Sequence, residues 1–189
     1  MHPIERLRFV ARSSGVPAAV LVHETALALR SFRGDHAGLV AACRRVVERQ
    51  PTQGPLWWLC ARMLCASDPA AEALVALDEI ESDTTGRCLA AELPDSATVV
   101  LVGTPEQSAD GLRRRGDLEV LVLDADGRAS VVVDRLEDAD VDAFEVPLRN
   151  AGGALRGASV LVAEAVAVGP SDALVPAGTV PAAAAARSM

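Results

Sequence analysis

Apolar residues in the first half of the chain recur at the three- and four-residue spacing of amphipathic helices. The spacing predicts five helices, separated by Gly15, by Gly34, by Gln50-Pro51 and by Asp68-Pro69. The fifth helix is expected to begin at Pro69 and to run on, with a weak point between Gly86 and Pro94. Five helices with short connections predict a bundle-like domain over residues 1–94.

From Ala97 the pattern changes to short, nearly continuous apolar runs rich in valine, namely ATVVLVG, LEVLVLD, FEVPL and ASVLVAEAV. Such runs are typical of strands buried on both faces of a parallel sheet. Most segments between them have the length of a helix, and this alternation predicts an open sheet covered by helices. The expected fold class is therefore α/β, with an all-helical domain at 1–94 and a Rossmann-like parallel-sheet domain at 95–189.

One stretch, VLVLDADGRASVVVD, allows two interpretations. Its periodicity slightly favours a hairpin that turns at Asp126-Gly127. The alternative is a crossover helix from Arg128 to Asp138, which would keep the strands on either side of it parallel.

The net charge of −8 argues against a broad nucleic-acid or anionic-membrane partner, because both need a basic face. The N-terminal stretch MHPIERLRFVARSSG carries charges where a signal peptide would be apolar. No apolar run is long and uninterrupted enough to span a bilayer. A cytoplasmic protein is the simplest expectation.

The cysteines predict no metal centre. They are Cys43, Cys60, Cys65 and Cys88, which lack CxxC spacing and fall within helical patterns. Buried free thiols are therefore expected in preference to zinc ligands or disulfides, and no cofactor is expected.

Three stretches resemble the family that joins the regulatory alpha, beta and delta subunits of translation initiation factor 2B to methylthioribose-1-phosphate and ribose-1,5-bisphosphate isomerases. RSSGVPAAV, which begins at Arg12, resembles the family's turn between its first helices. VERQPTQGPLWWL resembles a segment of its helical domain, and ASVLVAEAVAVGPSDALVPAGTVPAAAAA resembles its Gly-Thr block. The resemblance spans nearly the whole chain, implies a helical domain before a Rossmann-like domain, and favours a helix after Gly127.

The same resemblance implies that the isomerase chemistry is missing. Isomerases of this family use a cysteine, an aspartate and a phosphate clamp to move protons on a sugar phosphate. The resemblance places the family's aspartate at Ala165, its lysine at Pro176 and its cysteine at Gly103-Thr104. Its phosphate-contacting arginine segment corresponds to residues 124–127. Loss of a general acid or base costs about 10²- to 10⁴-fold in rate, so the family reaction is not expected.

Five residues are candidates for binding a ligand. Gly103 and Thr104 follow a strand and precede a helix, so they either cradle a phosphate or form a tight β–α turn. Gly178 and Thr179 either form a strand-to-helix turn with Thr179 as the N-cap or contact phosphate. Arg12, in the turn that resembles the family's, is the fifth candidate.

Two carboxylates are candidates for relocated catalysis, namely Glu164 and Asp172. Glu164 stands next to the vacated aspartate position at a strand end, where open α/β sheets bind ligands. The alternative is a surface or interface residue. The run Arg113–Arg115 is expected at a helix C-terminus, with an arginine cluster for an acidic partner as the alternative.

The leading hypothesis is a non-catalytic initiation-factor-2B-like protein that binds a phosphorylated sugar or nucleotide, a protein partner, or both. The alternatives are a sugar-phosphate isomerase with relocated catalytic groups and a purely structural interaction module. In the family, further strands follow the Gly-Thr helix, so a short form with an open sheet edge is expected at Met189. A homodimer or a protein partner bound through the C-terminal domain is the corresponding expectation.

Overall fold

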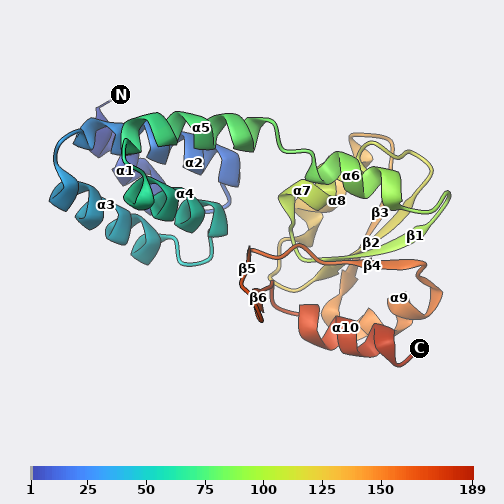
Figure 1. Ribbon diagram of the computed structural model, residues 1–189. Helices are drawn as coiled ribbons and strands as arrows, with labels where there is room; N and C mark the ends of the chain where they lie inside the picture. Colours follow the sequence, from blue (N-terminus) through green and yellow to red (C-terminus); the bar gives the residue numbers. More distant parts are fainter. Residues whose placement is uncertain (1) are drawn as a thin grey trace. The chain divides into compact units, whose positions relative to one another are not determined.

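The computed structural model describes residues 2–189, which form two compact units (Figure 1). The first unit extends to Asp83, and its described residues form helices and turns. The second begins at Thr84 and contains a parallel sheet with helices on both faces, so the α/β class is confirmed. No helix of the described residues is both long and apolar enough to cross a membrane.

The helical unit contains α1 (Pro3–Arg12), α2 (Ala18–Leu29), the 3₁₀ helix η1 (Arg30–Phe32), α3 (His36–Arg49), α4 (Gly54–Cys65) and α5 (Pro69–Glu81). Two of these helices start at aspartate N-caps. Asp35 Oδ1 accepts a hydrogen bond from the N–H of Gly38 at 2.8 Å, and Asp68 Oδ1 accepts one from the N–H of Ala70 at 3.0 Å. The caps fix where α3 and α5 begin.

The core of this unit is formed by inward-facing residues of its α-helices, among them Val10, Leu21, Leu29, Leu39, Leu56, Leu59, Met63 and Ala76. A buried amide joins two of the helices. Gln50 Nε2 donates to the carbonyl oxygens of Val10 at 2.6 Å and Ser13 at 2.9 Å. The end of α3 is therefore tied to the end of α1.

The prediction of buried free thiols holds for two of the four cysteines. Cys43 on α3 and Cys60 on α4 are buried, whereas Cys65 and Cys88 are exposed. The hydrogen bond to Cys43 and burial both raise the pKa of the Cys60 thiol. Cys65 ends α4, and the helical pattern does not bury a residue at that position.

The fifth predicted helix is divided into two. α5 ends at Glu81, and α6 (Thr85–Glu92) follows after a short break. The break lies at residues 82–84, just before the weak point that the sequence pattern placed between Gly86 and Pro94. α6 packs in the second unit, although the sequence boundary at residue 94 placed it in the helical domain.

The sheet consists of β1 (Thr98–Val102), β2 (Glu119–Asp124), β3 (Asp142–Pro147) and β4 (Val160–Val162). Their order is β3-β2-β1-β4, and every neighbouring pair is parallel. These strands are the four apolar runs of the sequence. A separate antiparallel pair, β5 (Ala167–Val168) and β6 (Ala173–Leu174), follows β4.

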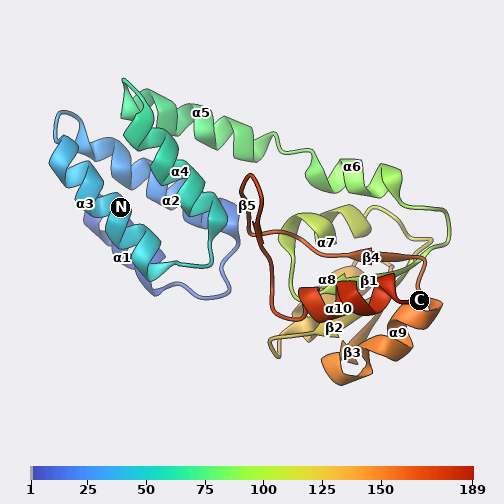
Figure 2. The same ribbon diagram turned by 60° about the horizontal axis from the view of Figure 1, so that its bottom comes forward.

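Helices cover both faces of the sheet. α6, α7 (Glu106–Leu112) and α8 (Ala129–Glu137) cover one face, and α9 (Ala151–Gly157) and α10 (Thr179–Arg187) lie side by side on the other (Figure 2). The side chains of β1 alternate between the faces. Val99 and Leu101 belong to the apolar cluster of α7 and α8, and Val100 and Val102 belong to that of α9 and α10.

The stretch with two interpretations forms α8, so the hairpin that its periodicity favoured is wrong. Asp124 explains the difference, because its Oδ1 accepts from the N–H groups of Gly127 at 2.8 Å and Arg128 at 3.1 Å. These bonds start a helix directly after β2. Val132 and Leu136 then lie buried at helical spacing.

α6 and α7 meet main chain to main chain at two glycines. A Cβ atom on Gly111 would lie 2.5 Å from the carbonyl oxygen of Gly86. A Cβ atom on Gly86 would lie 2.7 Å from the carbonyl oxygen of Gln107. Only hydrogen fits in these positions, because a neighbouring main chain cannot rotate away as a side chain can. The contact attaches α6 to the α/β unit.

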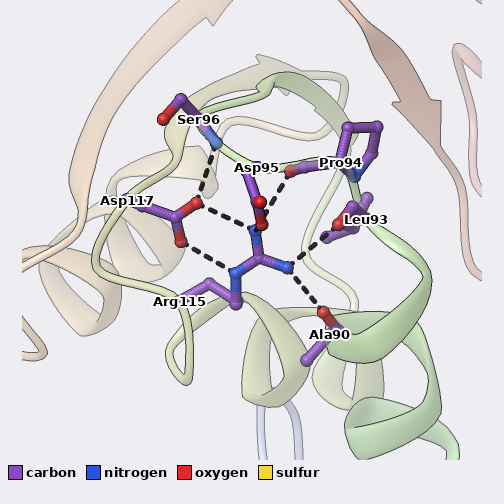
Figure 3. Close-up of polar contacts among 7 residues, drawn as sticks. All are labelled: Ala90, Leu93, Pro94, Asp95, Ser96, Arg115 and Asp117. Atoms are coloured by element: carbon purple, nitrogen blue, oxygen red, sulfur yellow. Dashed lines mark hydrogen bonds and ion pairs between the residues drawn. The ribbon is translucent and has the colours of Figure 1, made fainter.

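A polar network around Arg115 joins the end of α6 to the sheet (Figure 3). Arg115 Nη1 donates to two carbonyl oxygens at the end of α6, those of Ala90 at 2.8 Å and Leu93 at 3.0 Å. Its Nε and Nη2 bind the carboxylate of Asp117 at 2.8 and 2.9 Å. Asp117 also accepts from the N–H of Ser96, just before β1, at 2.8 Å. Arg115 follows α7, as expected, but the helix that it caps is α6.

We expect Gly111→Ala to destabilise the α/β unit by about 1–3 kcal/mol, because the new methyl group must push α6 and α7 apart. Gly152→Ala on α9 is the matched control, since no atom lies within 4 Å of its added Cβ. That control is expected to be neutral or stabilising by about 0.5–1 kcal/mol. Urea unfolding followed by circular dichroism measures both, and equal effects would contradict the close contact.

A second expectation concerns pH. Arg115 and the Ser96 N–H hold the pKa of Asp117 well below its usual value. A lowered pKa means that the carboxylate stabilises the fold at neutral pH and loses this effect as the pH falls below about 4. Asp117→Asn is therefore expected to lower the melting temperature at pH 7, with a smaller difference from the wild type below pH ~4.

Asp95→Asn is the control for this experiment, because Asp95 is fully exposed and its contact with Arg115 is long, at 3.4 Å. Its melting temperature is expected to follow that of the wild type. A gap between Asp117→Asn and the wild type that does not change with pH would contradict an ionic contribution.

Candidate functional site

The carboxyl ends of the four parallel strands meet at one edge of the sheet. β1 lies between β2 and β4, so the connections on its two sides lead to opposite faces. Open α/β sheets bind ligands at such a switch point. Four connections start there: the turn after β1 at Gly103, the turn after β2 at Asp124, the segment after β3 that leads to α9, and the segment after β4 that contains Glu164.

The turn after β1 is held on β2. Gly103 has φ of 70°, and its N–H donates to the carbonyl oxygen of Leu123 at 3.1 Å. The hydroxyl of Thr104 accepts a hydrogen bond from Arg128 Nη2 at 3.2 Å. Arg128 also contacts Asp126, at 2.8 Å. The guanidinium of Arg128 therefore lies at this edge as an ion pair with Asp126.

The start of α10 reaches the same edge. Gly178 has φ of 85° and packs so closely that an added Cβ would lie 3.3 Å from the Cβ of Ala125, just after β2. Pro176 lies next to Gly103, since an added Cβ there would be 3.6 Å from the Cβ of Pro176. The structure thus brings the Gly103-Thr104 turn and the Gly178-Thr179 turn together at the sheet edge.

The N-terminus of α10 has no side-chain cap. Gly178 occupies the N-cap position, so the prediction of Thr179 as N-cap is wrong. Thr179 is instead the first helical residue and is only 9% exposed. Its Oγ1 is buried and has no hydrogen-bond partner among residues 2–189. A buried hydroxyl without a partner is costly, and it is satisfied when a ligand or a water molecule binds it.

The N-termini of α7 and α8 are occupied by carboxylates of the protein. Glu164 Oε2 accepts from the N–H of Ser108, in the first turn of α7, at 2.8 Å and from its hydroxyl at 3.0 Å. Asp124 Oδ1 accepts from the N–H of Ala129, the first residue of α8, at 3.3 Å, and from those of Gly127 and Arg128 just before it. Glu164, a candidate catalytic carboxylate, therefore acts as a cap of α7.

The other predicted residues lie apart from this edge or add little to it. Asp172 lies in the exposed turn between β5 and β6, where its carboxylate accepts from the hydroxyl of Ser171 at 2.8 Å. Arg12 ends α1 in the helical unit. The cysteines lie on α3, α4 and α6. Among the described residues, no three His, Cys, Asp or Glu side chains are grouped as a metal ion would require.

Sequence reasoning missed one residue of this edge, Arg128, and did not establish the state of another, Thr179. Arg128 was considered only as the possible start of a helix, and its contact with Thr104 depends on the turn that Asp124 forms. The buried hydroxyl of Thr179 could have been suspected from its place in the Gly-Thr dipeptide. Its lack of a partner is visible only in three dimensions.

No protein-family model matches the chain, and no curated protein matches it in sequence. Solved structures do match its fold. The translation initiation factor eIF-2B of Pyrococcus horikoshii OT3 matches with a TM-score of 0.78 and 15% identity, over 98% of this chain and 74% of that chain. The tetrameric eIF2B-beta2-delta2 complex from Chaetomium thermophilum matches with a TM-score of 0.72 and 15% identity, over 98% of this chain and 73% of that chain.

The eIF2B delta structure from C. thermophilum has a TM-score of 0.71 and 17% identity, with 98% of this chain and 83% of that chain covered. At these identities the likeness establishes the fold. The helical domain followed by a Rossmann-like domain, which the resemblance in sequence implied, is therefore confirmed, and the chain has the eIF2B-like fold.

Proposed function

We propose that this chain is a non-catalytic eIF2B-like protein whose α/β unit binds a small phosphorylated molecule, a sugar phosphate or a nucleotide. The observation that carries the proposal is the buried, unpartnered hydroxyl of Thr179 at the uncapped N-terminus of α10. Helix N-termini attract phosphate, because their N–H groups lack intrahelical acceptors and the helix dipole favours negative charge. A phosphate oxygen there would accept the Thr179 hydrogen bond.

The neighbouring groups favour the same ligand class. Gly178 and Gly103 lack a Cβ, which lets Ala125 and Pro176 pack against them and brings the two turns together beside the start of α10. The guanidinium of Arg128 lies beside Thr104. Asp124 and Glu164 already accept from main-chain N–H groups at the starts of α8 and α7. α10 and α9 both start without a side-chain cap, and α10 also carries the unpartnered hydroxyl that favours an anion there.

The absence of isomerase chemistry is part of the proposal. Alanine and proline stand at positions 165 and 176, where the resemblance places the acidic and basic residues of the isomerases. Glu164, the nearest replacement, is engaged with Ser108. Proton transfer on a sugar needs an acid and a base free to exchange protons with the substrate.

A protein partner also belongs to the proposal. One of the similar structures is printed as a tetrameric complex of eIF2B beta and delta. In this chain β4 (Val160–Val162) is the last strand of the sheet and pairs with β1 on one side only. Its residues carry no charge that would discourage pairing with a further strand on the open side. We propose that the α/β unit associates with a second copy or with a protein partner, in the cytoplasm.

The ligand proposal is tested by thermal shift and calorimetry with ribose-5-phosphate, ribose-1,5-bisphosphate, methylthioribose-1-phosphate and nucleoside monophosphates. A ligand at ~100 times its dissociation constant is expected to stabilise the chain by ~2.7 kcal/mol. Thr179→Val is expected to abolish this shift while leaving the free protein at least as stable, because it removes an unsatisfied hydroxyl. Thr98→Val, at the opposite end of β1, is the matched control and keeps the shift. A panel without any shift, or an unchanged shift in Thr179→Val, would refute the proposal.

The isomerase alternative is tested at Glu164. Because Glu164 caps α7, Glu164→Ala is expected to destabilise the chain by about 0.5–2 kcal/mol. Asp172→Ala, in an exposed turn, is expected to leave stability unchanged. Neither variant is expected to change isomerase turnover, because the wild type is expected to have none. Measurable turnover on ribose-1,5-bisphosphate that disappears in Glu164→Ala would establish the alternative instead.

A further inference from the structure

A cavity of about 540 Å³ lies in the helical unit, apart from the site proposed above. It is formed by two connections between helices, the one from η1 to α3 and the one from α4 to α5. Its apolar wall includes Leu29 and Leu39, which are buried, and Phe32, which is partly buried. The cavity is large enough for a small organic molecule with an apolar part.

The same cavity is lined by three basic side chains, Arg30, Arg33 and His36. Two arginines of this unit have carboxylate partners, Arg6 with Glu24 and Arg62 with Glu72. For the three side chains of the cavity, no ion pair occurs within residues 2–189. The arginines Arg30 and Arg33 thus place two positive charges, without ion-pair partners in the described part of the chain, beside the apolar wall of the cavity.

The acidic residues nearest to the cavity do not neutralise these bases. Asp68 lines the cavity, but its Oδ1 accepts from the N–H groups of Ala70 at 3.0 Å and Ala71 at 3.1 Å. Asp35, beside His36, is engaged with the N–H of Gly38. Both carboxylates serve as N-caps, so the basic side chains remain available for a ligand.

Arg30 gives the second, independent observation. Its Nε is buried and has no hydrogen-bond partner among the described residues. Burying a charged donor without an acceptor costs more than burying a neutral one, and native proteins rarely leave such a group unsatisfied. An arginine fork matches the geometry of carboxylate and phosphate oxygens. An anion in the cavity would therefore supply the acceptor that the protein lacks.

We propose that this cavity binds a small amphiphilic anion, with its carboxylate or phosphate group on Arg30 and its apolar chain against Leu29, Phe32 and Leu39. The anionic group supplies the missing acceptor for Nε, and the apolar chain is removed from water by the wall. This site lies wholly in the helical unit, so its test does not depend on the phosphate site proposed at α10.

The probes are heptanoate and hexyl phosphate, which carry the same six-carbon alkyl chain on different anionic groups, with 1-hexanol and inorganic phosphate as controls. Calorimetry on the full chain is expected to show saturable binding of one or both amphiphilic anions, at least tenfold tighter than either control. The ¹⁵N-resolved Nε–Hε signal of Arg30, assigned by its loss in Arg30→Gln, is expected to shift on binding. The anion that binds more tightly identifies the head group.

Arg30→Gln is expected to weaken binding at least tenfold without lowering the melting temperature of the free protein, because Nε has no partner to lose. Arg45→Gln, at an exposed position of the same unit outside the cavity, is the matched control and keeps wild-type affinity. The proposal is overturned by an Arg30 signal that neither anion moves, by equal affinity for 1-hexanol, or by Arg30→Gln binding as tightly as the wild type. If Arg30→Gln does not fold, the response of the Arg30 Nε–Hε signal in the wild-type protein still tests whether the anion binds at Arg30.

Discussion

A parallel sheet has to be covered on both faces, and most features of the α/β unit depend on this constraint. Each strand must return to the same end of the sheet before the next begins, so the chain alternates strands with helices. Three helices cover one face and two cover the other. The same constraint collects the carboxyl ends of all four strands, with the loops that follow them, at a single edge.

That edge gathers helix N-termini as well as loops, and each N-terminus carries unsatisfied N–H groups. The chain satisfies two of these helices with its own carboxylates, Asp124 on α8 and Glu164 on α7. Each carboxylate is an internal equivalent of a bound anion. At α10 no side chain has this role, and a buried threonine hydroxyl stands beside the uncapped turn. α9, which follows β3, also begins without a side-chain cap, so what distinguishes α10 is the buried threonine hydroxyl beside its first turn.

Much of this fold can be predicted from the sequence, because burial leaves a periodic signal. The four strands coincide with valine-rich runs, and the N-terminal helices follow a three- and four-residue spacing. The periodic signal gives the wrong element where a single polar side chain determines which element forms. α8 forms because Asp124 caps it, although the residues around Gly127 alternate like those of a hairpin. α6 joins the sheet through a contact between glycines, which have no side chain to enter a hydrophobic pattern.

The candidate site was predictable to a lesser degree. The two Gly-Thr turns could be located because each follows a strand and precedes a helix. The state of each group could not be inferred: that Glu164 is engaged, that Arg128 reaches Thr104, and that the hydroxyl of Thr179 is free. The same holds for Arg30, whose missing partner depends on the directions in which Asp35 and Asp68 turn to cap their helices.

The contact between Gly86 and Gly111 also bears on how this fold can diverge. A mismatch between two side chains can be repaired by a compensating substitution in either partner. A main-chain contact allows no such repair, because every residue other than glycine adds a carbon atom at the same place. Two glycines, one before β1 in the sequence and one after it, are therefore a sequence marker of this helix pair.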